Sequence, residues 1–305
     1  MTDRRVLVTG ANGFIGRRAL AALPADMELH GISRHEASSL QSVTGDIRWH
    51  EADILDSKTH APLIARVRPT HLLHLAWNTQ SGVFWTAPDN QTWCDASISL
   101  LEAFCAAGGK RAVMTGTGAE YSNDALSPLD EYDAPQEPHS YYGQMKLRLL
   151  RRAVSIAEQH GVEFAWARIF NAYGAFEKPE RLIPYVINTL LDGEPARCSS
   201  GRQVRDFADV RDLGAALAAL LVSPVTGVIN LGGGQAVSIA DLVTKIGDLI
   251  GRPELIRLGA LEDRAHEPVH QVPKLERMRT QLGFTPQIDL DRGLRDTIAW
   301  WRARH

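Results

Sequence analysis

The residues from Gly10 to Gly16 constrain the fold of this chain more than any other segment. They read Gly-Ala-Asn-Gly-Phe-Ile-Gly, directly after an apolar run and directly before a helix-favouring stretch of Arg, Ala and Leu. A buried strand, a glycine turn and a helix in this order bring backbone N–H groups and the positive end of a helix dipole together. The order is typical of a dinucleotide pyrophosphate site, although glycine turns also join strands to helices for packing reasons alone.

The first half of the chain alternates apolar runs with helix-like segments. Strands are expected at 6–9, 29–33, 47–52, 71–75, 112–115 and 164–168, with helices between them at 15–23, 62–67, 98–107 and 141–160. This alternation predicts βαβ units and an α/β fold, a Rossmann-like doubly wound parallel sheet. A ligand crevice is expected at the carboxyl ends of its strands.

The pattern loosens after residue 170, where prolines become frequent and helices are expected near 209–221, 239–250 and 290–302. We therefore expect a dinucleotide-binding Rossmann domain over 1–170. A smaller mixed α/β substrate domain is expected over 171–305, with segments exchanged between the two. A cleft between them would hold a second ligand.

Composition excludes several classes of partner. The net charge is −3, and Lys and Arg are spread along the chain, so neither nucleic acid nor a membrane is an expected partner. The longest apolar stretch is too short to cross a bilayer, and charged residues precede the first strand where a signal peptide would be apolar. Three cysteines at wide spacing suit free thiols in a reducing compartment, so a cytoplasmic location is expected.

Tyr142 and Lys146 lie four residues apart at the start of the expected helix 141–160, so both side chains share one face. A phenol needs its pKa lowered by about three units to act as an acid or base near neutral pH, and a neighbouring ammonium favours that change. The spacing also arises by chance in surface pairs. The glycine turn upstream favours the catalytic interpretation.

A hydroxyl-rich turn follows the expected strand 112–115, and its Thr117 hydroxyl could bind the oxygen that Tyr142 protonates. The alternative is a plain turn in which the threonine satisfies its own backbone.

Together these segments resemble the extended short-chain dehydrogenase/reductases, in the branch that acts on nucleotide-diphosphate sugars as epimerases, dehydratases and reductases. The motifs that carry the resemblance run almost from end to end: Gly10-x-x-Gly13-x-x-Gly16, Asp53-Ile54, His74-Leu75-Ala76, Thr117 four residues before Tyr121, Tyr142-x-x-x-Lys146, Arg168-Ile169-Phe170-Asn171-x-Tyr173-Gly174, Arg205-Asp206-Phe207-x-x-Val210-x-Asp212 and Leu282-Gly283-Phe284-x-Pro286.

The resemblance implies that Tyr142 is the catalytic acid/base, that Lys146 lowers its pKa and holds the nicotinamide ribose, and that Thr117 binds the reacting oxygen. The expected cofactor-binding residues are Gly10, Gly13, Phe14, Ile15, Gly16, Ser33, Arg34, Asp53, Ile54, Leu75 and Ala76, with Tyr142 and Lys146. The expected substrate-binding residues are Trp77, Asn171, Arg205 and Arg264. Family members often pair two helices from each subunit, so a homodimer is expected.

The end of the second expected strand bears on the choice of cofactor. It reads Ser33-Arg34, with no carboxylate to accept bonds from a free ribose 2′-hydroxyl. Because an Arg attracts a 2′-phosphate, NADP(H) is favoured over NAD(H). Alternatively, Arg34 is a solvated residue or stacks on adenine.

Two local features refine the function. The related dehydratases carry an acidic pair where this chain has Gly118 and Ala119, which disfavours dehydration. The segment 77–93 is rich in aromatic residues, with Trp77, Phe84, Trp85 and Trp93, and these rings either pack on a deoxysugar or anchor a loop.

The segment His266-Glu267-Pro268-Val269-His270 fits the letters of a zinc-protease helix, but a central proline breaks helices, so no metal site is expected.

The leading hypothesis is therefore NADPH-dependent reduction of a nucleotide-diphosphate 4-keto-6-deoxysugar. A 4-epimerase with tightly bound NAD uses the same residues and is the first alternative. A dinucleotide sensor without catalysis is disfavoured, since such proteins commonly lose the Tyr and Lys.

Overall fold

The computed structural model describes residues 4–34, 46–265 and 267–305. Its centre is a seven-stranded parallel sheet in the order β10-β6-β5-β4-β1-β2-β3. The strands are β1 (Arg5–Thr9), β2 (Glu28–Ser33), β3 (Ile47–Glu51), β4 (His71–His74), β5 (Arg111–Thr117), β6 (Glu163–Ile169) and β10 (Gly227–Leu231). The order reverses at β1, which confirms the Rossmann-like doubly wound fold.

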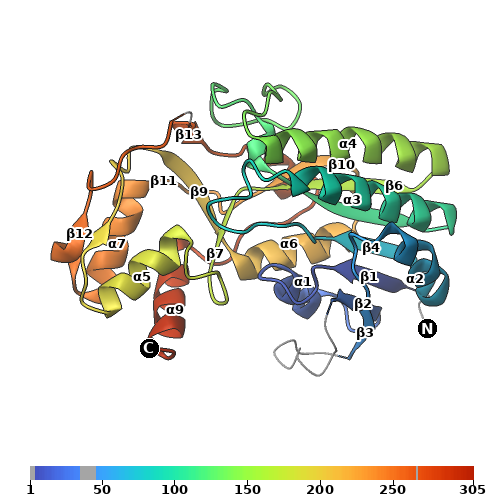
Figure 1. The fold of residues 1–305 in the computed structure, drawn as a ribbon, viewed down its shortest axis with the longest axis horizontal. Helices are drawn as coiled ribbons and strands as arrows, with labels where there is room; N and C mark the ends of the chain where they lie inside the picture. The colour runs from blue at the N-terminus through green and yellow to red at the C-terminus, as the bar shows by residue number, and fades with distance from the viewer. Residues whose placement is uncertain (1–3, 35–45, 266) are drawn as a thin grey trace.

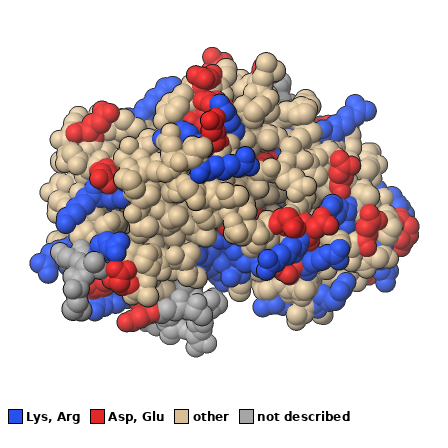
Figure 2. All heavy atoms as spheres, turned by 180° about the vertical axis from the view of Figure 1, so that it is seen from behind, with Lys and Arg blue, Asp and Glu red and all other residues tan. Residues whose placement is uncertain are grey.

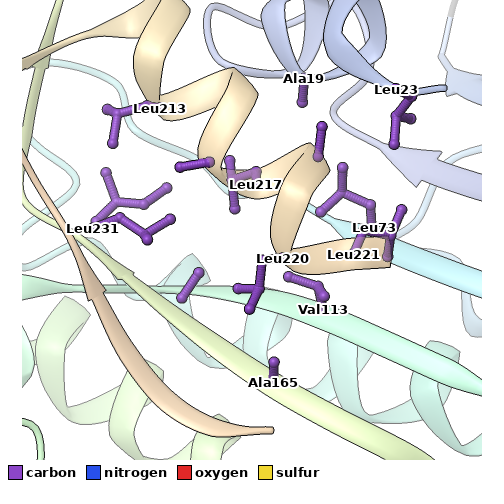
Figure 3. Close-up of a cluster of buried hydrophobic side chains, with 14 of the residues drawn as sticks. Ala19, Leu23, Leu73, Val113, Ala165, Leu213, Leu217, Leu220, Leu221 and Leu231 are labelled. Carbon is purple, nitrogen blue, oxygen red and sulfur yellow. The ribbon is translucent and has the colours of Figure 1, made fainter. Parts of the chain in front are cut away.

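Helices cover both faces of this sheet (Figure 1). One face packs against α2 (His60–Val67), α3 (Asp89–Ala106) and α4 (Tyr141–His160). The other packs against α1 (Gly16–Ala22) and α6 (Val210–Val222), where leucines of α6 meet Val113, Ala165 and Leu231 of the sheet (Figure 3). Short 3-10 turns η2 (Ser57–Thr59) and η3 (Gly118–Glu120) precede α2 and follow β5.

The remaining elements form a second, smaller layer. Strands β7 (Asn171–Tyr173), β9 (Val204–Asp209), β11 (Ala236–Ser238) and β13 (His270–Gln271) make a mixed sheet, and β8 (Ala196–Arg197) pairs with β12 (Ile256–Arg257). The helical elements around them are α5 (Leu182–Leu191), α7 (Ile239–Ile250), η4 (Pro253–Leu255) and α9 (Leu290–Arg302), whereas α8 (Glu276–Thr280) packs on β10 of the large sheet. A third core cluster lies among α5, α7 and α9.

The division of the chain at residue 170 stays a prediction. Although β10 and α6 follow that point in sequence, β10 is a strand of the large sheet and α6 packs against it. Every strand expected in the first half is present within a residue or two. Helix α3 begins at Asp89, nine residues before its expected start, and α5 was missed because Pro184 lies inside it. Pro184 is the third residue of α5, in the first turn, where a missing N–H costs no helical bond.

Acidic and basic side chains are interspersed over the face drawn in Figure 2, without a broad region of one sign. Within the described ranges, no helix is both long and apolar enough to cross a membrane. Cys94, Cys105 and Cys198 are buried free thiols, as expected.

Candidate active site

The glycine turn is too tight for any side chain at its key positions. The Gly13 N–H donates to the Gly10 carbonyl over 2.9 Å, and a Cβ on Gly16 would lie 2.0 Å from that same oxygen. Gly10 has a φ of +65°, and a Cβ there would lie 3.0 Å from the Ala76 nitrogen. The turn therefore packs directly on the carboxyl end of β4, with Phe14 and Ile15 half-buried before α1.

A buried polar chain holds the end of β4 beside this turn. The Thr9 hydroxyl accepts hydrogen bonds from the Leu75 and Ala76 N–H groups, each over 3.1 Å, and lies 2.9 Å from His74 Nδ1. His74 Nε2 lies 2.8 Å from the Ser97 hydroxyl of α3. Burial lowers the pKa of His74 to about 3, so the imidazole is neutral. Sequence reasoning missed Thr9, whose signal was a hydroxyl residue ending the first strand.

Tyr142, Lys146 and Thr117 lie together where β5 ends and α4 begins. Ser140 caps α4 by accepting from the Gly143 N–H over 3.1 Å, which fixes the first helical turn. Lys146 Nζ donates to the Thr115 carbonyl over 2.9 Å. Burial raises the pKa of Tyr142 above its ordinary value, and a hydrogen bond with the Thr117 hydroxyl opposes that rise.

The Lys146 ammonium contacts an aromatic ring as well. Its nitrogen lies 3.9 Å from the centroid of the Trp77 ring, and burial lowers the pKa of Lys146 to about 7. Burial is the largest influence on the pKa of Tyr142 and raises it. The expected lowering of that pKa by Lys146 stays a prediction.

Three rings of the aromatic segment surround Tyr142 edge-on. The ring centroids of Trp77, Phe84 and Trp85 lie 6.1, 5.0 and 5.9 Å from that of Tyr142. Asn90 fixes the segment, because its Oδ1 accepts from Trp77 Nε1 over 2.8 Å and its Nδ2 donates to the Phe84 carbonyl over 2.7 Å. Phe84 is buried and therefore anchors the segment, whereas Trp85 remains 37% exposed.

The other expected cofactor residues lie at the carboxyl ends of β2 and β3. Ser33 ends β2 and is buried, and Arg34 is exposed. Asp53 is exposed and accepts from the Leu55 N–H over 3.0 Å. Ile54 is buried, with its carbonyl 2.8 Å from His60 Nε2. This leaves the Arg34 guanidinium accessible beside the end of β2.

Of the expected substrate residues, Asn171 and Arg205 lie in the second sheet. Asn171 Nδ2 donates to the Asp206 carbonyl over 3.1 Å, and the buried Arg205 guanidinium pairs with Glu267 over 3.0 Å. Arg264 is exposed, close in sequence to Glu267. His266 lies outside the described residues. Among those described, no group of three or more His, Cys, Asp or Glu side chains is placed to hold a metal ion.

Glu120 is a residue of this region that sequence reasoning missed. Thr117 and Glu120 form a capping box at the start of η3, in which the Thr117 hydroxyl accepts from the Ala119 N–H and the Glu120 carboxylate accepts from the Thr117 N–H. The signal was present as Thr-x-x-Glu, the capping-box spacing. Glu120 is fully buried and paired with Arg168, so it does not replace the acidic pair that Gly118 and Ala119 lack.

The doubly wound sheet, its glycine turn and the Tyr-x-x-x-Lys helix define an α/β protein of the extended short-chain dehydrogenase/reductase type. The model of the NAD dependent epimerase/dehydratase family matches residues 6–232, and the chain belongs to that family.

Relatives of this chain have several activities. It is 28% identical to a UDP-glucose 4-epimerase of Corynebacterium glutamicum, over 93% of this chain and 91% of the relative. Among solved structures, a UDP-N-acetylglucosamine 4-epimerase from Methanobrevibacter ruminantium M1, in complex with UDP-N-acetylmuramic acid, superposes with a TM-score of 0.88 at 25% identity over 100% of both chains. A dTDP-glucose 4,6-dehydratase from Streptomyces venezuelae, with NAD bound, has a TM-score of 0.85 at 26% identity over 98% of this chain and 97% of that chain.

Proposed function

We propose that this protein catalyses hydride transfer between a nicotinamide cofactor and a ring carbon of a nucleotide-diphosphate sugar, with Tyr142 as the acid/base. The observation that carries the proposal is the meeting of Tyr142, Thr117 and Lys146 at the carboxyl end of β5. The glycine turn packs against the end of the adjacent strand β4. The acid/base residues and the bound cofactor would therefore lie at the same edge of the sheet.

The residues present fit a dinucleotide. A Cβ on Gly16 would lie 2.0 Å from the Gly10 oxygen, so this glycine allows the turn to close tightly at the start of α1. Gly13 is half-buried in the same turn and has no side chain to keep a pyrophosphate from its backbone. Gly10, Gly13 and Gly16 would hold that group, Asp53 and Ile54 the adenine, and Lys146 the nicotinamide ribose. When bound, the cofactor supplies or accepts the hydride.

The protein's own residues would transfer the proton and stabilise the negative charge that develops on the substrate oxygen. When a ketone is reduced, the Tyr142 phenol gives its proton to the carbonyl oxygen, and the Thr117 hydroxyl donates a hydrogen bond to the same atom as charge develops there. The phenolate then regains a proton from solvent. Tyr142 is buried among aromatic rings, which would limit the access of water to the reacting oxygen during the transfer.

The direction that we favour is net reduction of a 4-keto-6-deoxysugar by NADPH. Two observations support it. The exposed Arg34 follows β2, where a 2′-phosphate would be bound, and the acidic pair that dehydration needs is replaced by Gly118 and Ala119. The nucleotide diphosphate would be bound by Asn171 and Arg205, with Arg264 at its edge and Trp77 on the sugar side.

A 4-epimerase with tightly held NAD is the second candidate. The relatives from Corynebacterium glutamicum and Methanobrevibacter ruminantium favour it, because both are named 4-epimerases. In either case we expect a homodimer built on α3 and α4, which pack against each other at the surface of the molecule (Figure 1).

One experiment separates these candidates. The purified protein is analysed for bound dinucleotide and is then incubated with nucleotide 4-keto-6-deoxysugars and NADPH or NADH, while the absorbance of reduced cofactor is followed. Loss of NADPH absorbance with a protein that carries no bound NAD supports the reductase. Tightly bound NAD, with interconversion of nucleotide hexoses and no net consumption of cofactor, supports the epimerase. Neither reaction, together with intact dinucleotide binding, would support a sensor.

A further inference from the structure

The turn that carries Thr117 is held by a buried carboxylate. Glu120 Oε1 accepts from the Thr117 N–H over 2.8 Å, and the Thr117 hydroxyl accepts from the Ala119 N–H over 3.2 Å. Glu120 is fully buried. The carboxylate therefore fixes the backbone of the residue whose hydroxyl meets Tyr142.

Glu120 is itself held by two side chains of the neighbouring strand β6. Arg168 Nε lies 2.6 Å from its Oε2, with both side chains fully buried, and Trp166 Nε1 lies 3.1 Å from each carboxylate oxygen. Arg168 also donates to the Glu131 carbonyl over 3.2 Å. A buried ion pair contributes little stability compared with apolar residues of equal volume. Here the ion pair instead holds the Glu120 carboxylate in one orientation.

The same turn packs tightly against the first turn of α4. A Cβ on Gly143, the residue after Tyr142, would lie 2.2 Å from the Ala119 carbonyl oxygen. On the other side, a Cβ on Gly116 would lie 2.3 Å from Glu120 Oε1. Gly143 therefore allows the backbone of η3 to pack against α4, and Gly116 leaves room for the Glu120 carboxylate.

We propose that Glu120 is a positioning residue of this site, which sets Thr117 at a fixed place relative to Tyr142 by locking η3 against α4. The inference rests on the proposed function, since it takes Thr117 and Tyr142 as the groups that hold the reacting oxygen. The charge of Glu120 acts in the same region, where it raises the pKa of Tyr142, although less than burial does.

The test compares two ion pairs, Glu120–Arg168 just beyond the carboxyl end of β5 and Arg111–Glu163 at the amino ends of β5 and β6. Glu120→Gln removes the charge that orients Arg168 at the carboxyl ends of β5 and β6. Glu163→Gln is the control at the opposite ends of these strands, where the exposed Glu163 pairs with the buried Arg111 over 3.1 Å. Both variants are measured for steady-state turnover and for thermal unfolding.

We expect Glu120→Gln to lower kcat about 10-fold or more, with the KM for the nucleotide sugar changed less than about 3-fold, because misplaced groups slow chemistry without weakening remote binding contacts. Glu163→Gln should leave kcat within about 2-fold of the wild-type value. If Glu120→Gln does not fold, Arg168→Lys keeps the charge but not the rigid guanidinium, and the same loss of kcat is expected.

A folded Glu120→Gln or Arg168→Lys variant with wild-type kcat would overturn the inference, as would an equal loss of kcat in the Glu163 control. If Tyr142→Phe still abolishes turnover in that case, the proposed function stands and only the role of Glu120 is wrong. A wild-type protein without turnover on any nucleotide sugar would overturn both.

Discussion

The ammonium nitrogen of Lys146 lies 3.9 Å from the centroid of the Trp77 indole ring. The same indole packs edge-on to Tyr142, with ring centroids 6.1 Å apart, so one aromatic side chain contacts both proposed catalytic groups. Replacing it should therefore disturb both.

We predict that Trp77→Leu lowers kcat about 10-fold, because water reaches Lys146 and Tyr142 loses one of its packing partners. Trp77→Phe keeps an aromatic face over Lys146 and should stay within about 3-fold of wild type. Steady-state kinetics of the two variants, with matched unfolding measurements, checks this. Equal activity of both variants would show that the ring only anchors the segment.

The glycine turn gives a graded prediction. A Cβ at Gly16 would lie 2.0 Å from the Gly10 oxygen, whereas a Cβ at Gly13 would lie 3.0 Å from it. Gly16→Ala should therefore weaken dinucleotide binding more than about 10-fold, and Gly13→Ala clearly less, since the second needs a shift of only a few tenths of an ångström. Titration with reduced cofactor measures both. An equal effect of the two alanines would contradict the close packing of this turn.

Arg34 should decide the cofactor preference. Arg34→Glu replaces an attractive charge by a repulsive one beside the expected 2′-phosphate, so kcat/KM for NADPH should fall about 10-fold or more. The value for NADH should change less than about 3-fold. Arg66→Glu, an exposed position on α2, is the control. A parallel loss with both cofactors would mean that Arg34 does not contact the 2′-position.

His74 should make stability depend on pH. Its pKa is lowered to about 3 in the folded protein, below the ordinary value of 6.5, so the unfolded chain takes up a proton first as pH falls. The free energy of unfolding should therefore decrease between pH 6.5 and 3, by about 3 kcal/mol at pH 4.5. Urea unfolding at pH 7.5 and 4.5 gives the total change. The change should be smaller by that amount in His74→Asn, and an identical change in variant and wild type would exclude His74 as its source.

Sequence was enough for six of the seven strands of the large sheet, because most of them are apolar runs bounded by a turn or a helix, as expected of a parallel sheet buried on both faces. Strand β10 was not expected, because it lies beyond residue 170, where the alternation of strands and helices is lost. The second, smaller sheet was harder to predict from the sequence. Its strands β7 and β13 are short, and β9 carries charged residues: Arg205 and Asp206 are buried with partners distant in the chain, such as Glu267 and the Gly233 N–H. Such pairings leave no periodicity in the sequence.

The site was predictable to a similar extent. The positions of Thr117, Tyr142 and Lys146 followed from their spacing and from the family resemblance, whereas the buried environment of Tyr142 did not. That environment depends on Phe84 and Trp85, which reach Tyr142 only after residues 77–93 have folded around Asn90. Neither the raised pKa of the phenol nor the pairing of Glu120 with Arg168 is visible without these tertiary contacts.

The account depends most on the Tyr142 hydroxyl, and Tyr142→Phe removes it while keeping the ring and its aromatic contacts. The decisive measurement is turnover of the nucleotide sugar by this variant, alongside its affinity for the dinucleotide. We predict a fall in turnover of about 1,000-fold, the size expected for a lost general acid, with affinity for the dinucleotide within about 3-fold of wild type. Wild-type turnover by Tyr142→Phe would contradict the account.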